Sequence, residues 1–99
     1  MAKKQTLFTE AKHKYLADII SFKNPQKAKG SVIELLNEFQ DAGRVKKLRI
    51  ARATLQASNR AKATLNRRNL SAKERKEFTD IAQIYKTASE YMFKEYEGY

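Results

Sequence analysis

The sequence contains no cysteine, no tryptophan, one proline, one histidine and three glycines among its 99 residues. Without cysteine there is no disulfide framework, no thiolate nucleophile and no zinc site with cysteine ligands. His13 lies between Lys12 and Lys14 and would leave a transition metal short of ligands, so we expect it on the surface. Because no Ser-His-Asp set, carboxylate pair or glycine-rich phosphate loop is present, we expect no enzyme activity, no metal and no cofactor.

Long apolar runs are also missing from the sequence. The N-terminus is basic, but Glu10, Lys12 and Lys14 interrupt the apolar segment that a signal peptide needs. The stretch 50–65 offers mainly alanine opposite its charges, whereas binding to a membrane surface needs bulky apolar side chains. We therefore expect a cytoplasmic protein that has no contact with a membrane.

The sequence is rich in hydrophobic residues and in residues that favour helix. Hydrophobic residues make up 41% of the chain, and alanine, lysine, leucine, glutamate and arginine all favour helix. The sequence predicts one all-α domain over residues 1–99, a small bundle of three helices, or four if the long central helix divides. The first helix is expected over about residues 6–22. Asn24-Pro25 ends it, although Pro25 also suits the first turn of the next helix.

The second helix is expected to start at Ser31, which forms a capping box with Glu34. Gly43 either ends this helix or is absorbed into a longer one that continues to about residue 66. The apolar stripe keeps a nearly constant period through Gly43, which favours one long helix over residues 31–66 with a kink allowed at residue 43.

The last helix is predicted over residues 71–96, because Ser71 and Glu74 form a second capping box. Tyr85 falls on its apolar face and is expected in the core. The remaining C-terminal aromatic residues are expected to cover a helix end or a partner subunit, and these are Tyr91, Phe93, Tyr96 and Tyr99.

The formal net charge is +10, and it is concentrated in the middle of the chain. Residues 41–70 contain nine basic side chains and one acidic side chain, Asp41, so eight of the ten net charges lie there. With no acid between residues 42 and 70, these cations repel one another and call for an external anion. The candidate nucleic-acid-binding residues are Arg44, Lys46, Lys47, Arg49, Arg52, Arg60, Lys62, Arg67 and Arg68.

Arginine accounts for six of these nine cations, and its planar guanidinium suits bidentate contact with phosphate. Helical spacing places Ile50, Ala53, Ala57 and Ala61 on one face, where small side chains would let another helix approach closely. The arginines flank that face.

Three runs carry a resemblance to a known group of proteins. Residues 48–54 (LRIARAT), 57–61 (ASNRA) and 69–75 (NLSAKER) resemble a family of small basic helical proteins of unassigned function from archaea and their viruses. The resemblance spans most of the chain and brings no site residues. It implies an archaeal or viral setting, in which small basic proteins often coat or compact DNA.

These observations favour a non-enzymatic protein that binds double-stranded DNA in a chromatin-like or nucleoid-associated role. Phosphate contacts from a helix over residues 44–68 would give little sequence specificity. One alternative is an RNA-binding or ribosome-associated protein. Another is a structural assembly subunit, such as a viral coat protein that covers nucleic acid. A homodimer or higher homo-oligomer is expected in each case.

Overall fold

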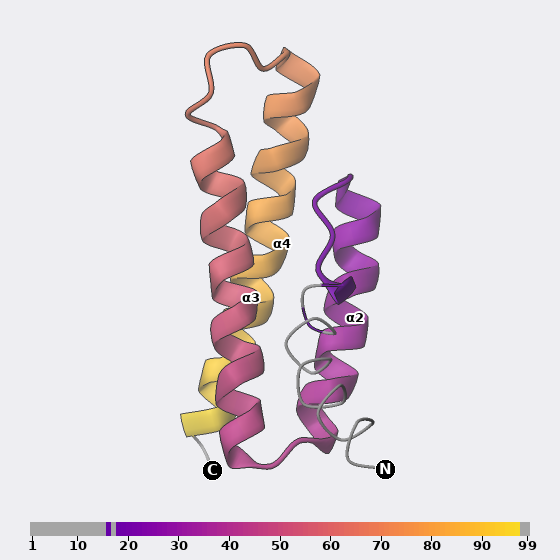
Figure 1. Cartoon of the computed structure of the whole chain (residues 1–99), viewed down its shortest axis with the longest axis vertical. Coiled ribbons are helices and arrows are strands. Elements are labelled where there is room, and N and C mark those ends of the chain that lie inside the picture. The colour runs from indigo at the N-terminus through magenta and orange to yellow at the C-terminus, as the bar shows by residue number, and fades with distance from the viewer. Residues whose placement is uncertain (1–15, 17, 98–99) are drawn as a thin grey trace, which may run out of the picture.

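The computed structural model describes residue 16 and residues 18–97 of the chain. Within that part it contains three helices and no strand, namely α2 (Pro25–Asp41), α3 (Arg44–Thr64) and α4 (Ala72–Glu97). Successive helices run antiparallel, and α3 and α4 form one long hairpin with α2 beside it (Figure 1). The all-α architecture predicted from the sequence is therefore confirmed.

Most of the helix expected over residues 6–22 lies outside the described residues, as does His13. In the part that is described, Leu16, Asp18 and Ile19 are helical, and the backbone N–H of Ile20 donates to the carbonyl oxygen of Leu16 at 3.2 Å.

Helix α2 begins at Pro25, six residues before the expected start at Ser31. The Asn24 side chain caps it by accepting a hydrogen bond from the N–H of Lys27 at 2.8 Å, and proline suits the first turn because its missing N–H would have no helical acceptor. Ser31 lies inside the helix, where its Oγ is within hydrogen-bond distance of the carbonyl oxygens of Ile19 and Lys27. The prediction of Ser31 as a cap was wrong, because the helix has already begun at Pro25. The buried Ser31 hydroxyl instead bonds the preceding segment to α2.

The prediction of one helix over residues 31–66 was also wrong. Helix α2 ends at Asp41, both Ala42 and Gly43 have extended backbone, and Gly43 is the N-cap of α3. The two extended residues reverse the chain, so α3 returns antiparallel to α2 (Figure 1). The apolar stripe continues across the break because both helices face the same core, which is why its period could not reveal the turn.

Small side chains form the seam between α3 and α4. Ala51, Ala57 and Ala61 of α3 are buried, and so is Ala82 of α4. Ser58 is also buried here, and its Oγ donates to the carbonyl oxygen of Ala82 at 2.8 Å. Of the face predicted to admit another helix, Ile50, Ala57 and Ala61 are buried within the chain, whereas Ala53 is half-buried and lines the groove described below.

Tyr85 is fully buried in the core, as predicted. Its hydroxyl accepts a hydrogen bond from the N–H of Ser21 at 2.9 Å and donates one to the carbonyl oxygen of Ser21 at 2.7 Å. Its ring also packs against Phe22, with centroids 5.9 Å apart. These contacts hold segment 18–22 against the helices, where it forms one wall of the groove described below.

Helix α4 begins within one residue of the predicted start. The N–H of Ser71 donates to Oε1 of Glu74 at 3.0 Å, and the N–H of Glu74 donates to Oγ of Ser71 at 3.1 Å. The predicted capping box is therefore confirmed. Hydrogen bonding of the Glu74 carboxylate to the Ser71 backbone N–H, and secondarily to the Ser71 side chain, favours the charged form and lowers the pKa of Glu74.

Candidate nucleic-acid interface

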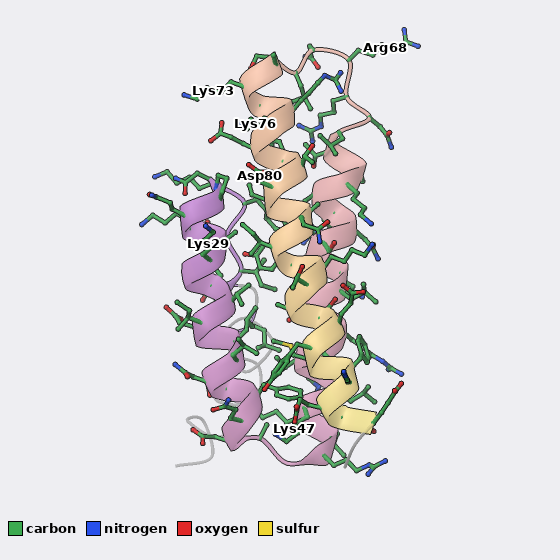
Figure 2. The ribbon with its side chains drawn as sticks, turned by 180° about the vertical axis from the view of Figure 1, so that it is seen from behind. Lys29, Lys47, Arg68, Lys73, Lys76 and Asp80 are labelled. Carbon is green, nitrogen blue, oxygen red and sulfur yellow. The ribbon has the colours of Figure 1, made fainter. Side chains whose placement is uncertain are left out.

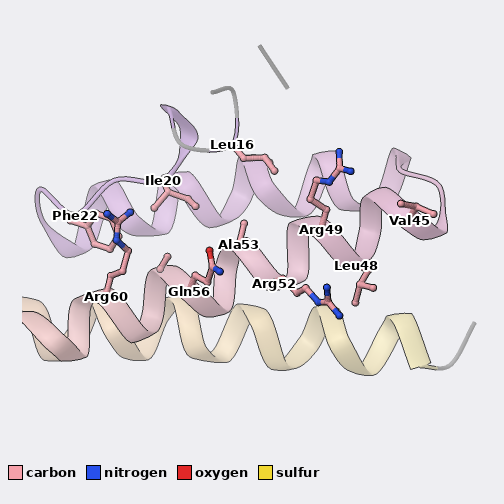
Figure 3. A pocket seen from close by; sticks show the side chains of 11 residues that line it. Leu16, Ile20, Phe22, Val45, Leu48, Arg49, Arg52, Ala53, Gln56 and Arg60 are labelled. Carbon is pink, nitrogen blue, oxygen red and sulfur yellow. The ribbon is translucent and has the colours of Figure 1, made fainter. Parts of the chain in front are cut away.

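Three of the nine predicted cations lie together on the exposed side of α3. Arg49, Arg52 and Arg60 are all exposed, and at 100° per residue they fall within an arc of about 80° around the helix axis. Gln56 is exposed on the same side and lies between them along the helix. Arg49 and Arg60 extend toward the side on which Phe22 lies, whereas Arg52 extends toward the other (Figure 3).

These arginines line a groove of about 500 Å³, here called the arginine groove. One wall is the segment carrying Leu16, Ile20 and Phe22, and the other is α3. The rest of the lining on α3 is Gln56 and the apolar side chains of Val45, Leu48, Ala53 and Ala57. The apolar lining residues are here called the floor of the groove, and the polar ones, Arg49, Arg52, Gln56 and Arg60, its rim (Figure 3).

No acidic side chain is among the described residues that line the arginine groove. Helix α3 has no aspartate or glutamate along its whole length, and neither does the connection 65–71. The start of α4 differs, since Lys73 and Lys76 line a surface hollow together with Glu77 and Asp80. Mixed charge of that kind is typical of an ordinary solvated surface, whereas the field at the groove is of one sign.

Lys47 does not belong to the interface, and its assignment as a binding residue is corrected here. Its side chain is only 6% exposed, and its Nζ donates to the carbonyl oxygen of Phe39 at 2.6 Å. The same Nζ lies 4.3 Å from the centroid of the Phe39 ring. Lys47 therefore joins the start of α3 to the last turn of α2, near the connection between them (Figure 2).

The other predicted cations are spread along the molecule. Arg44 is exposed at the start of α3, with its guanidinium carbon 5.0 Å from the centroid of the Tyr96 ring, and Lys46 is half-buried. Lys62, Arg67 and Arg68 are exposed at the other end of α3 and on the connection to α4, where Arg68 extends from the tip of the hairpin (Figure 2). The exposed cations therefore form two groups. The groove group is Arg49, Arg52 and Arg60, and the tip group is Lys62, Arg67 and Arg68.

Arg75 contacts the backbone of this tip, a role that no sequence pattern indicates. Its Nη1 donates to the carbonyl oxygen of Leu65 at 3.0 Å, and its Nη2 donates to the carbonyl oxygen of Arg67 at 3.1 Å. The planar guanidinium thereby holds the connection that carries Arg67 and Arg68. In the sequence Arg75 is one of several alternating charges, so nothing distinguishes it from a solvated residue.

Aromatic side chains are scarce at the rim of the arginine groove. Phe22 is the one aromatic residue among the described lining residues, and it is half-buried. Of the C-terminal aromatic residues, Phe93 and Tyr96 are half-buried, Tyr91 is 45% exposed, and Tyr99 lies outside the described residues. A binder of unpaired bases would interleave exposed aromatic rings with its cations, and the described part of this interface lacks that arrangement.

Residues 16 and 18–97 contain no cluster of three histidine, aspartate or glutamate side chains arranged to hold a metal ion. None of the helices in this part of the chain is both long and apolar enough to cross a membrane. No family model matches the sequence, and searches of curated proteins and of solved structures gave no significant match.

Proposed function

We propose that this protein binds double-stranded nucleic acid through the exposed side of α3, with duplex DNA as the favoured polymer and little sequence selectivity. The observation that carries the proposal is the grouping of Arg49, Arg52 and Arg60 on one exposed side of a helix that contains no acidic residue. Such a surface has a strong positive field and offers guanidinium groups to phosphate oxygens.

The dimensions of α3 suit a polyanion. Arg49 and Arg60 are separated by about 16 Å along the helix axis, which corresponds to about five base pairs of B-DNA. The tip group extends the cationic surface beyond Arg60. Gln56, together with the exposed Asn59, supplies amide N–H donors of the kind that accompany phosphate contacts.

Duplex is preferred over single strand because the rim of the groove lacks exposed aromatic rings. Binding of DNA would place the protein in a nucleoid-associated or chromatin-like role. Structured RNA presents the same phosphate chemistry, so it serves as the competing polymer in the test. An assembly subunit would pack the face of Ile50, Ala53, Ala57 and Ala61 on a neighbouring subunit. In the described structure Ile50, Ala57 and Ala61 are already buried within the chain, and Ala53 is half-buried.

The proposal is tested by measuring affinity for a labelled duplex across a range of salt concentrations. Six exposed cations form the groove and tip groups, namely Arg49, Arg52, Arg60, Lys62, Arg67 and Arg68. If about six side chains contact phosphates, the slope of log K against log salt should be near −5. In the groove-arginine variant, which combines Arg49→Gln, Arg52→Gln and Arg60→Gln, the slope should become shallower by about 2.7, at about 0.9 per lost contact.

A matched lysine control variant combines Lys29→Gln, Lys73→Gln and Lys76→Gln. These three lysines are exposed on α2 and α4 (Figure 2), so the control loses the same charge from other helices. It should keep nearly the wild-type slope. Equal slopes for the groove-arginine variant and the wild type would refute the assignment of binding to α3. If the protein prefers structured RNA to duplex DNA at fixed salt, RNA replaces DNA as the proposed polymer.

A further inference from the structure

The arginine groove has a feature that phosphate binding does not use. Leu16, Ile20, Leu48 and Ala53 line it with aliphatic carbon as well as the arginines, whereas a duplex backbone needs only the cations at the rim. We propose that this groove is also the docking site for an acidic amphipathic helix of a partner protein. The apolar face of that helix would lie on the floor, and its carboxylates would meet the arginines.

The length and spacing of the groove fit a helix. Its residues on α3 recur three or four positions apart from Val45 to Arg60, over about 22 Å, or four helical turns. Ala53 is half-buried and Ala57 is buried, and such small side chains permit the interaxial distance of about 8–10 Å at which helices pack. Val45 is 74% exposed, so an apolar side chain at one end of the groove remains to be covered.

The charge of the groove lining indicates the charge of the helix that binds there. Three arginines and no acid among the described lining residues favour glutamates on both flanks of the partner's apolar stripe, and they disfavour a basic helix. In a second copy of this chain, the first turns of α4 are a poor occupant, because Glu74 and Glu77 alternate there with Lys73 and Lys76.

Docking of this helix has a consequence for nucleic-acid binding. The same guanidinium groups would contact either carboxylates or phosphates, so the two partners exclude each other. The partner helix would therefore release the protein from a polyanion. This consequence rests on the proposed function, whereas the docking itself does not.

The test uses a labelled synthetic peptide in which leucines recur at three- and four-residue spacing and glutamates flank them. A permuted peptide of identical composition, without the apolar stripe, is the control ligand. Ala53→Phe fills the floor of the groove and leaves all three arginines in place. Ala63→Phe is the matched control, because Ala63 is exposed on α3 and does not line the groove.

We expect the patterned peptide to bind the wild type and the Ala63→Phe variant, and to displace labelled duplex. Ala53→Phe should weaken peptide binding by about tenfold or more, since it occupies the space that the leucines need, and should leave duplex binding nearly unchanged. The groove-arginine variant should lose the peptide and should bind duplex more weakly. Circular dichroism of each variant confirms that it is folded.

Several results would overturn the docking proposal. Equal binding of the permuted peptide would mean that charge alone attracts the ligand. Equal effects of Ala53→Phe and Ala63→Phe on peptide binding would place the peptide outside the arginine groove. A dimer of the peptide-free protein that Ala53→Phe dissociates would identify a second copy as the occupant. Failure of the two proposals can be told apart, since peptide binding without duplex binding refutes only the proposed function, and the reverse refutes only the docking.

Discussion

At the scale of single residues, Lys47 shows how one cation changes role with its surroundings. A buried ammonium group is stable only where its donors are satisfied. Lys47 meets this condition at the carbonyl oxygen and the ring of Phe39. The carbonyl lies in the last turn of α2, where the helix dipole favours a positive charge. The residue therefore stabilises the reversal between α2 and α3.

Replacing Lys47 with methionine should lower the free energy of unfolding by about 1–2 kcal/mol, because the charged hydrogen bond to Phe39 is lost while the aliphatic stem is retained. The free energy is measured by urea denaturation. Lys46→Met is the control in the same turn, since Lys46 is half-buried and should change stability much less. An equal loss in the two variants would contradict the role assigned to Lys47.

At the scale of elements, capping patterns predicted one helix start and missed another. Ser71 with Glu74 begins α4 as expected, whereas the same pattern at Ser31 with Glu34 lies inside α2. The difference is upstream, because Asn24 and Pro25 provide an earlier cap and first turn, and the helix then runs through Ser31. A local pattern can therefore mark where a helix is able to start, but competing signals decide where it does.

The candidate interface was predictable to the extent that it depends on helical periodicity. Periodicity alone places Arg49, Arg52 and Arg60 on one side of α3, as the structure does. The burial of Lys47 and the contacts of Arg75 depend on which segments pack together after the chain reverses at residues 42–43. Those contacts are tertiary, so the sequence pattern of α3 holds no information about them.

Arg75 is a positioning residue for the tip in our proposal, and a double-mutant cycle tests this role. Arg75→Gln removes two hydrogen bonds to the connection and should make the salt slope of duplex binding shallower. In a background that already carries Arg67→Gln and Arg68→Gln, adding Arg75→Gln should have little further effect.

The cycle distinguishes positioning from direct contact. If Arg75→Gln changes the slope equally in both backgrounds, Arg75 acts independently of Arg67 and Arg68, and the positioning role is refuted. Arg75→Lys is an additional control, because it keeps the charge but cannot form the planar fork to two carbonyl oxygens. It should behave like Arg75→Gln if the fork is what matters.

At the scale of the whole molecule, one set of contacts creates the arginine groove and another supplies its field. The wall of the groove is held by the hydrogen bonds between Tyr85 and Ser21, which lie 64 positions apart in sequence. The field comes from α3 and the tip, which carry most of the +10 net charge. Concentrating like charges on one helix disfavours the folded state through self-repulsion, and a bound polyanion offsets that effect.

This balance predicts how the stability of the free protein responds to salt. Raising the ionic strength from about 10 mM to 100 mM shortens the Debye length from about 30 Å to 10 Å. Screening of the repulsion along α3 should therefore raise the thermal midpoint of the wild type. The midpoint is measured by following the helical circular dichroism signal during heating. The groove-arginine variant should be at least as stable as the wild type at low salt, and its midpoint should rise less.

The lysine control variant separates this local effect from the effect of net charge. Its Lys73 and Lys76 lie beside Glu77 and Asp80, so removing them relieves little repulsion, and the midpoint should keep a salt dependence close to that of the wild type. If both variants lose the dependence equally, only the total charge matters. If neither does, the cations of α3 do not repel one another strongly enough to require an external anion, and the physical basis for assigning a polyanion to this helix is removed.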